Sequence, residues 1–196
     1  MSTQHHQDTL ELPMTYHRHV TVDFKKDRKF FLTLQAVFLV VVLIAAAVAL
    51  VLDLPLASGW NPGVTTLATV LSLVVYMAVH EATHGISLRL LTGTQPSYSV
   101  RFPFLSTSSS LYLTRRSLII AALAPCLIWG TVLLAALFLV PADARLTVYI
   151  LLALNFAGSA GDYLEAALAL RQPREALLQD EGDRVHVFLP GSTEKR

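Results

Sequence analysis

The sequence predicts an all-α membrane protein that has four transmembrane helices and a short cytoplasmic loop resembling a β-hairpin. Hydrophobic residues make up 54% of the chain and charged residues 15%, and the mean hydropathy is +0.53. A transmembrane helix needs about 20 predominantly apolar residues, and four windows are long enough: residues 30–52, 64–91, 118–140 and 146–170. We expect them to form one core over residues 30–170, between a cytoplasmic arm (1–29) and a cytoplasmic tail (171–196).

The distribution of positive charge predicts the orientation of these helices, because cytoplasmic loops are enriched in Lys and Arg. Four basic residues between Lys25 and Lys29 directly precede the first window, whereas residues 53–63 contain no Lys or Arg. Further arginines lie at the end of the second window or follow the second and fourth windows: Arg89, Arg101, Arg115, Arg116, Arg171, Arg174 and Arg184. Both termini are therefore expected in the cytoplasm, with an even number of crossings.

Composition argues against several other classes of protein. The net charge of +1 gives no field that would attract nucleic acid. Cys126 is the sole cysteine, so we expect it to pack inside the third window and not to form a disulfide. The first apolar run is longer than the core of a cleavable signal peptide and follows 29 largely polar residues, so the first helix is expected to stay in the mature protein.

The N-terminal arm contains one stretch with a clear period. Residues 16–24 alternate between two faces, which predicts a short strand or an extended arm. His17 and His19 lie on one of these faces and could share a metal ion, but no third ligand is near them in the sequence. We expect both side chains to be solvated.

The second window carries the motif His80-Glu81-Ala82-Thr83-His84. Residues four apart share one face of a helix, so the two imidazoles point to the same place. This H-E-x-x-H spacing is typical of a zinc site, with Glu81 placed to take a proton from a zinc-activated water. Ionisable groups inside a membrane helix cost about 2.5–3.5 kcal/mol each on insertion scales, which favours a functional role.

The fourth window supplies a candidate third ligand. Asp162 precedes Arg171 by nine residues, as His80 precedes Arg89 in a helix that runs the same way, so the two groups are expected at similar depth. Asn155 lies two turns before Asp162 and could hold the substrate backbone or a developing oxyanion. Glu165, one turn after Asp162, could be a further ligand or a hydrated residue near the interface.

The loop after the second window is expected to form a hairpin. Residues 97–102 alternate like a strand, residues 106–110 are rich in Ser and read as a turn, and residues 111–113 would return as a second strand. Two interpretations stay open: an edge that binds an extended peptide by strand addition, or a loop that dips into the interface.

Two features remain in the second half of the chain. Pro125 removes one backbone hydrogen bond from the third helix and can kink it. In the tail, residues 185–188 read as a strand, on which His186 is expected at the surface.

These motifs resemble, in part, the site-2 type of intramembrane zinc metalloproteases. That group carries its aspartate in Leu-Asp-Gly, whereas Asp162 stands between Gly161 and Tyr163. The sequence is more similar to a family of small bacterial membrane proteins named putative zincin peptidase, through His80–Gly85 and Gly158–Asp162. This resemblance implies His80, His84 and Asp162 as zinc ligands, Glu81 as general base, and the bacterial plasma membrane as location.

The expected function is that of a zinc metalloendopeptidase in the membrane. It would hydrolyse peptide bonds at or within the cytoplasmic half of the bilayer, using a water activated by zinc and Glu81 as base. Its partners would be a peptide or membrane-protein substrate and the lipid bilayer. Two alternatives use the same ligands: a zinc transporter or sensor, and an inactive protease-like chaperone. The presence of Glu81 favours the hydrolase, because a carrier needs ligands but no base.

Overall fold

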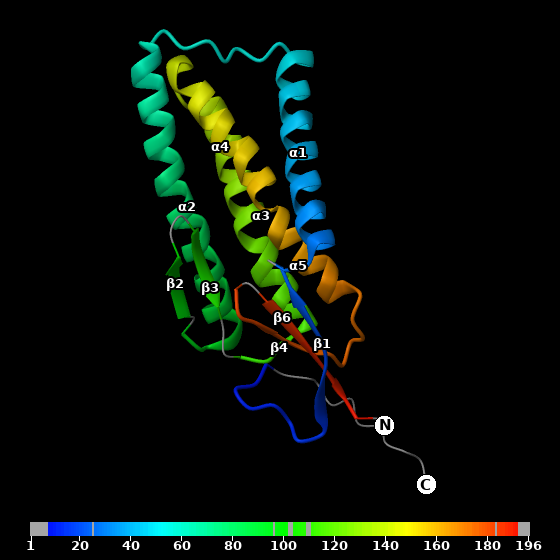
Figure 1. Cartoon of the computed structure of the whole chain (residues 1–196). Helices are drawn as coiled ribbons and strands as arrows, with labels where there is room; N and C mark the ends of the chain where they lie inside the picture. Colours follow the sequence, from blue (N-terminus) through cyan, green and yellow to red (C-terminus); the bar gives the residue numbers. More distant parts are fainter. Residues whose placement is uncertain are drawn as a thin grey trace.

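Four long helices form the body of the molecule (Figure 1). The computed structural model describes residues 8–24, 26–95, 97–101, 104–108, 111–182 and 184–191. Within these residues, four helical stretches are long and apolar enough to cross a membrane. They are α1 (Arg28–Val51), α2 (Pro62–Thr92), α3 (Arg115–Leu139) and a fourth made of η1 (Ala142–Ala144), α4 (Arg145–Gly158) and α5 (Ala160–Leu170).

Local signals in the sequence explain where these helices begin and end. Asp27 caps α1 by accepting from the N–H groups of Lys29 and Phe30, and short polar side chains are favoured at that position. Asn61 caps α2, and Pro62 follows at its first turn, where no amide hydrogen is needed. The helix ends at Gly93, whose φ of 71° suits glycine.

The fourth membrane-length stretch is broken where one continuous helix was expected. Helix α4 ends at Gly158 and α5 begins at Ala160, with the fully buried Ser159 between them. The residues around the break are small, but a Cβ added at Gly158 or Gly161 would meet nothing within 4 Å. Asp162 lies in the first turn of α5, directly after this break.

A four-stranded antiparallel sheet lies at one end of the helices (Figure 1). Its strand order is β1-β6-β5-β4, from β1 (Tyr16–Asp23), β6 (Arg184–Pro190), β5 (Leu177–Asp180) and β4 (Leu113–Thr114). The chain is therefore mostly helical but not all-α. Both predicted strands at the two ends of the chain exist, and they pair with each other, from Tyr16 opposite Pro190 to Asp23 opposite Arg184.

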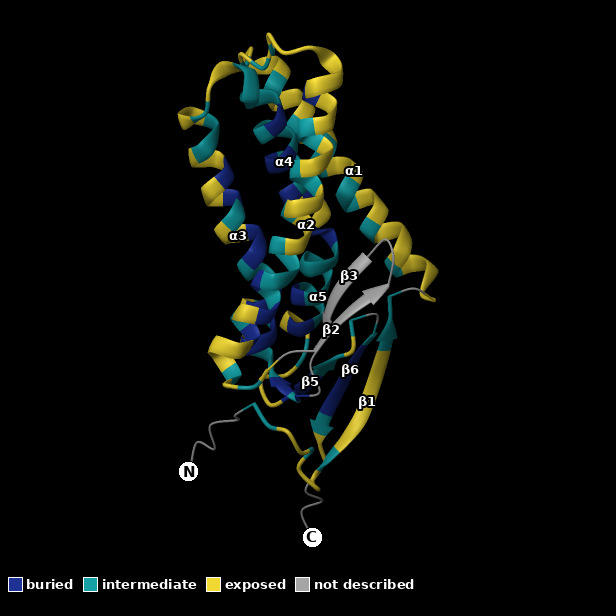
Figure 2. Cartoon of the chain, turned by 90° about the vertical axis from the view of Figure 1, so that its left-hand side faces the viewer, coloured by how far each residue is buried: buried dark blue, intermediate teal, exposed yellow. Residues whose placement is uncertain are grey.

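The main apolar core joins this sheet to the helix ends. Leu113, Leu178, Val185 and Val187 are completely buried, and they pack in one cluster with Leu88 of α2 and with residues of α3 and α5. Figure 2 shows this burial on β6, while α1 is exposed or intermediate along its whole length. The sheet thus fixes the positions of α2, α3 and α5 at the end of the bundle where His80, His84 and Asp162 lie.

Three expectations about the burial of His and Cys side chains can be compared with the structure. His17 and His19 are exposed, as expected. Cys126 is buried in α3, which confirms its packing role. The prediction for His186 was wrong: it is 5% exposed, because the pairing of β6 with β1 and β5 covers it, and its Nδ1 lies 2.8 Å from the Thr21 hydroxyl.

The hairpin after α2 differs from the prediction. Strands β2 (Ser97–Arg101) and β3 (Phe104–Ser108) pair with each other, from Ser97 opposite Ser108 to Arg101 opposite Phe104. The strand therefore returns earlier than predicted, since the Ser-rich residues pair in a ladder instead of turning. Residues 109–110 of the predicted turn lie outside the described residues. Leu113, predicted as the return strand, pairs instead with Leu178 of β5.

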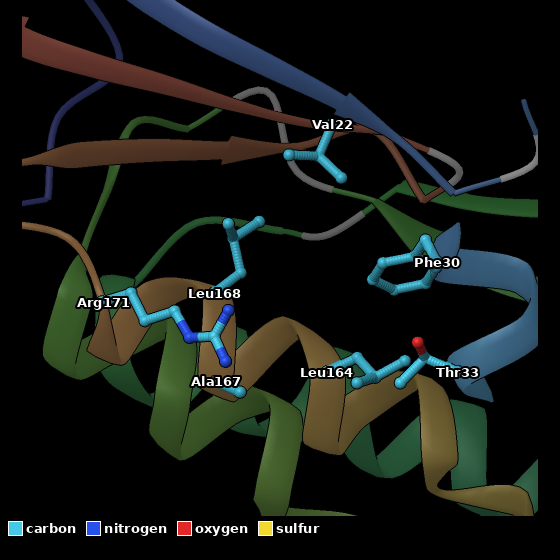
Figure 3. A pocket seen from close by; sticks show the side chains of 7 residues that line it. All are labelled: Val22, Phe30, Thr33, Leu164, Ala167, Leu168 and Arg171. Atoms are coloured by element: carbon cyan, nitrogen blue, oxygen red, sulfur yellow. The ribbon is translucent and has the colours of Figure 1, made fainter. Parts of the chain in front are cut away.

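A pocket of about 260 Å³ opens between β1, α1 and α5 (Figure 3). Its lining is mostly apolar, with Val22, Phe30, Leu164 and Leu168, and Arg171 lies at its edge. Leu164 and Leu168 are two and six residues after Asp162, which places them on the other side of α5. The pocket is therefore separate from the polar cluster described next.

Candidate metal centre

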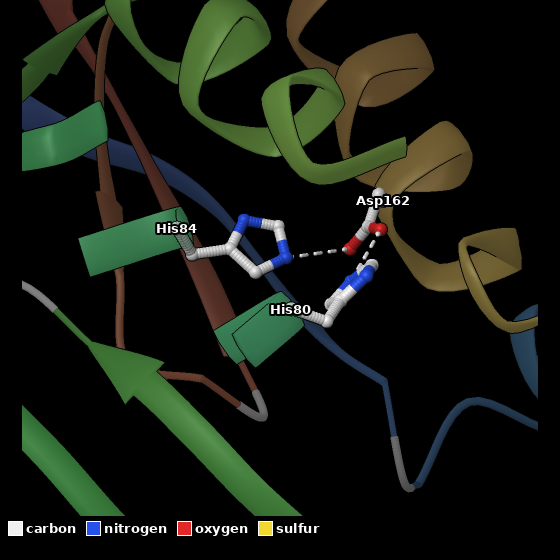
Figure 4. A group of neighbouring side chains, drawn as sticks. All are labelled: His80, His84 and Asp162. Atoms are coloured by element: carbon white, nitrogen blue, oxygen red, sulfur yellow. Dashed lines mark ion pairs between the residues drawn. The ribbon is translucent and has the colours of Figure 1, made fainter. Parts of the chain in front are cut away.

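Three ionisable side chains meet between α2 and α5 (Figure 4). His80 and His84 project from one face of α2, and their ring centroids are 5.0 Å apart. Asp162 comes from the first turn of α5. All three are partly buried, with side-chain exposures of 13%, 14% and 17%. The depth comparison between the second and fourth helices thus identified two segments that do come together.

The distances between these side chains suit one metal ion. His80 Nε2 lies 3.5 Å from Asp162 Oδ2, and His84 Nε2 lies 3.5 Å from Asp162 Oδ1. One ligand atom from each residue can be chosen so that all three lie within 4.8 Å of one another. Ligands about 2.0–2.2 Å from a tetrahedral zinc ion are about 3.3–3.6 Å apart. The two histidine–carboxylate separations therefore match those of a zinc site that has two imidazoles and one carboxylate, and the whole cluster is compatible with one.

A backbone carbonyl fixes the tautomer of His84. Its Nδ1 lies 3.0 Å from the carbonyl oxygen of Ala121 in α3. Since a carbonyl can only accept, Nδ1 carries the hydrogen and donates it. The lone pair of Nε2 is then directed toward Asp162.

A chain of three hydrogen bonds does the same for His80. The amide nitrogen of Asn155 donates to the carbonyl of Cys126 at 3.1 Å, which leaves its Oδ1 to accept from the Tyr76 hydroxyl at 2.6 Å. The Tyr76 oxygen can then accept from His80 Nδ1, 3.0 Å away. Outer partners of this kind orient the imidazole ligands of metals. Nε2 of His80 is left as an acceptor, as in His84.

With these two tautomers, the Nε2 atoms of His80 and His84 are hydrogen-bond acceptors, and they face the acceptor oxygens of Asp162. When both rings are neutral and carry their hydrogen on Nδ1, two Nε2 lone pairs face the Asp162 carboxylate, and Asp162 Oδ2 is buried without a hydrogen-bond partner among the described residues. A cation between these atoms satisfies all of them at once, since metal ligands must be deprotonated. The residues present therefore fit a zinc ion, which His80, His84 and Asp162 would hold.

Asn155, named above as a possible substrate or oxyanion contact, lies behind His80. It is 0% exposed, and both ends of its amide are engaged in the bonds to Tyr76 and Cys126. A contact between Asn155 and a substrate would require one of these bonds to break. Its position suits a residue that orients the candidate metal ligand His80 through Tyr76.

Glu81 and Glu165 lie around the three-residue cluster without belonging to it. Glu81 is half-buried, next to His80 in sequence and within electrostatic range of His84. Glu165 is within range of Asp162, and its Oε1 is buried with no hydrogen-bond partner among the described residues. The structure thus places Glu81 beside the histidines and gives Glu165 no place among the candidate ligands.

Sequence reasoning missed Tyr76 and Asp180. Tyr76 is one turn before His80, a spacing that could have suggested the contact. Asp180 stands at the end of β5, where burial raises its pKa to about 6; Glu81 and Asp162 add to this rise, and the Gly182 N–H and His84 oppose it. The turn of acidic residues and glycine between two apolar runs was the available signal for this hairpin.

Comparisons with known proteins agree with the motif. A family model described as putative zincin peptidase matches residues 73–177, more than half of the chain. The match includes His80, Glu81, His84 and Asp162 and ends before Asp180. No curated protein and no solved structure matches the chain. The chain belongs to the putative zincin peptidase family.

Proposed function

We propose that this protein is a membrane-embedded zinc metallopeptidase that cleaves peptide bonds at or within the cytoplasmic half of the bilayer. One observation carries this proposal: His80, His84 and Asp162 converge on one point, with Glu81 beside them, in a chain of the zincin peptidase family. Two imidazoles and one carboxylate are a ligand set typical of catalytic zinc, which keeps a further position open. A structural site would be closed by a fourth protein ligand.

In the proposed peptide hydrolysis, the metal and Glu81 have different roles. Zinc held by the three residues would lower the pKa of a water toward about 7 and polarise a peptide carbonyl. Glu81 accepts the proton of the attacking water as the new C–O bond forms. It then gives that proton to the amide nitrogen as the C–N bond breaks. The products are a free carboxylate and a free amine.

Two features support a site on the cytoplasmic side. The β1–β6 pairing joins a strand that precedes the four helices to one that follows them, which supports an arrangement with both strands on the same side of the membrane. The main core cluster joins their sheet to the ends of α2, α3 and α5 near the three-residue cluster. Basic residues 25–29 favour the cytoplasm for that side.

The β2–β3 hairpin is our candidate for substrate binding. β3 packs against α2, the helix that carries both histidines. A two-stranded sheet offers an edge to which an extended peptide can add as a further strand. The substrate class would then be an unfolded or extended segment of a peptide or membrane protein.

Glu81→Gln tests the proposal. The variant keeps side-chain size but cannot accept a proton, so we expect nearly unchanged zinc content and a loss of turnover of about 10²-fold or more. Glu175→Gln, which changes an exposed glutamate, is the matched control. The assay compares the membrane proteome of cells that express each variant, with metal content measured on purified protein. Unchanged processing by Glu81→Gln, together with loss of processing by Asp162→Ala, would mean that the metal is carried or sensed instead.

A further inference from the structure

The third helix contains a proline beside the metal centre. Pro125 has no amide hydrogen, so the carbonyl four residues earlier, that of Ala121, has no donor within the helix. Both residues are buried in α3. Buried carbonyls in proteins are almost always paired, so this carbonyl needs a donor from another element.

The donor is a candidate zinc ligand. His84 Nδ1 lies 3.0 Å from the Ala121 oxygen. The helical position that Pro125 leaves vacant is therefore occupied by the imidazole of the H-E-x-x-H motif. The carbonyl of Cys126, the next residue, is the anchor of the Asn155–Tyr76–His80 chain. The segment of α3 around the proline thus holds the outer nitrogens of both histidines.

We propose that Pro125 is a positioning residue of the metal centre. By removing one donor from α3, it reserves the Ala121 carbonyl for His84, which fixes the tautomer and the ring orientation in which Nε2 faces the metal. This inference rests on the zinc site proposed above, but it concerns a residue that touches neither metal nor substrate.

An ordinary packing role for Pro125 makes a different prediction. Prolines in membrane helices are tolerated because neighbouring groups pair the freed carbonyl, and a kink could serve packing alone. In that case the shape of the helix would matter and the N–H at position 125 would not. With an N–H present, Ala121 would accept from its own helix, and His84 would compete with it for the same oxygen.

Two substitutions at position 125 separate these roles. Pro125→Ala introduces the N–H. Replacement of Pro125 by lactic acid through nonsense suppression introduces the methyl side chain of alanine, but with a backbone ester in place of the amide, so that no N–H is present. The full-length proteins, purified in detergent, are titrated with Zn²⁺ against a chelating indicator, and the Co²⁺ absorption spectrum reports ligand geometry. His84→Ala is the reference for a lost ligand.

We expect Pro125→Ala to lower zinc affinity about 10- to 100-fold, the effect typical of outer partners of metal ligands, and to change the Co²⁺ spectrum. The ester variant should bind zinc like the wild type. Equal affinity of Pro125→Ala and the wild type would overturn the proposal, and so would an equal loss in both variants, which would show that the ring or kink is what matters.

Two further outcomes are possible: Pro125→Ala does not fold, or the proposed zinc site does not exist. If Pro125→Ala is not recovered folded, His84 is replaced by Nδ1-methylhistidine, which keeps Nε2 but cannot donate to Ala121. We expect the same loss of affinity, and binding equal to the wild type would overturn the proposal. If the wild type binds no zinc, or if His84→Ala binds as well as the wild type, it is the proposed metal site that fails.

Discussion

Removing the hydroxyl of Tyr76 should weaken zinc binding without touching a ligand. Tyr76→Phe deletes the oxygen that lies 2.6 Å from Asn155 Oδ1 and 3.0 Å from His80 Nδ1. Since Asn155 is completely buried, its oxygen then has no partner, which costs about 1–3 kcal/mol of folding free energy. The His80 ring is also free to rotate or to change tautomer. We therefore expect zinc affinity to fall about 10- to 100-fold.

Tyr149→Phe is the matched control, because the Tyr149 hydroxyl donates to the carbonyl of Ala45, between α4 and α1 and away from the site. Zinc affinity is measured by competition with an indicator, and stability by thermal unfolding in chelator. Tyr149→Phe should lose some stability and keep wild-type affinity. Unchanged zinc affinity in Tyr76→Phe would refute the assigned tautomer of His80 and the role of its outer partner.

Further predictions follow from the packing, the orientation and one titrating group. Gly130→Ala should cost about 1–3 kcal/mol in thermal unfolding, because its Cβ would lie 2.9 Å from Phe156 Cζ and 3.2 Å from Nδ2 of the fully buried Asn155, whereas Gly158→Ala, with nothing within 4 Å, should be neutral. Reporter fusions at residues 29, 105 and 175 should report the cytoplasm and one at residue 58 the outside; an external signal at 105 would contradict the orientation. In the zinc-free protein, the contribution of Asp180 to stability should fall as pH rises from about 4 to about 6, because its raised pKa lets the folded state hold a proton that the unfolded state has released. Asp180→Asn should flatten that slope by at most roughly 1.4 kcal/mol per pH unit, the value for one proton, and equal slopes in unfolding experiments would contradict the shift.

The helices and the three-residue cluster could be predicted because their signals are local or follow from helix geometry. Membrane length identified the four apolar stretches, and the four-residue spacing of His80 and His84 needed only the helix period. Asp162 was identified because two helices that cross the membrane in the same direction place residues at equal distances from their cytoplasmic ends at similar depth. Each of these inferences uses a rule that holds inside one helix.

The sheet and the outer partners could not be predicted in this way. β1 pairs with β6 across most of the chain, from Val22 to Val185, and no local pattern states which strands will meet. The roles of Tyr76 and Asn155 depend on the approach of α2, α3 and α4, which is set by packing. The error at β3 came from assigning a turn to a Ser-rich stretch that a partner strand stabilises.

The strand order also sets an order of assembly. Among the described strands of this sheet, β6 is synthesised after β1, β4 and β5, yet it lies between β1 and β5. Contacts between residues this far apart in sequence form late. During synthesis β1 must therefore wait with an unpaired edge, and such edges invite aggregation. The sheet at the end of the metal-binding helices therefore closes only once β6 has been made.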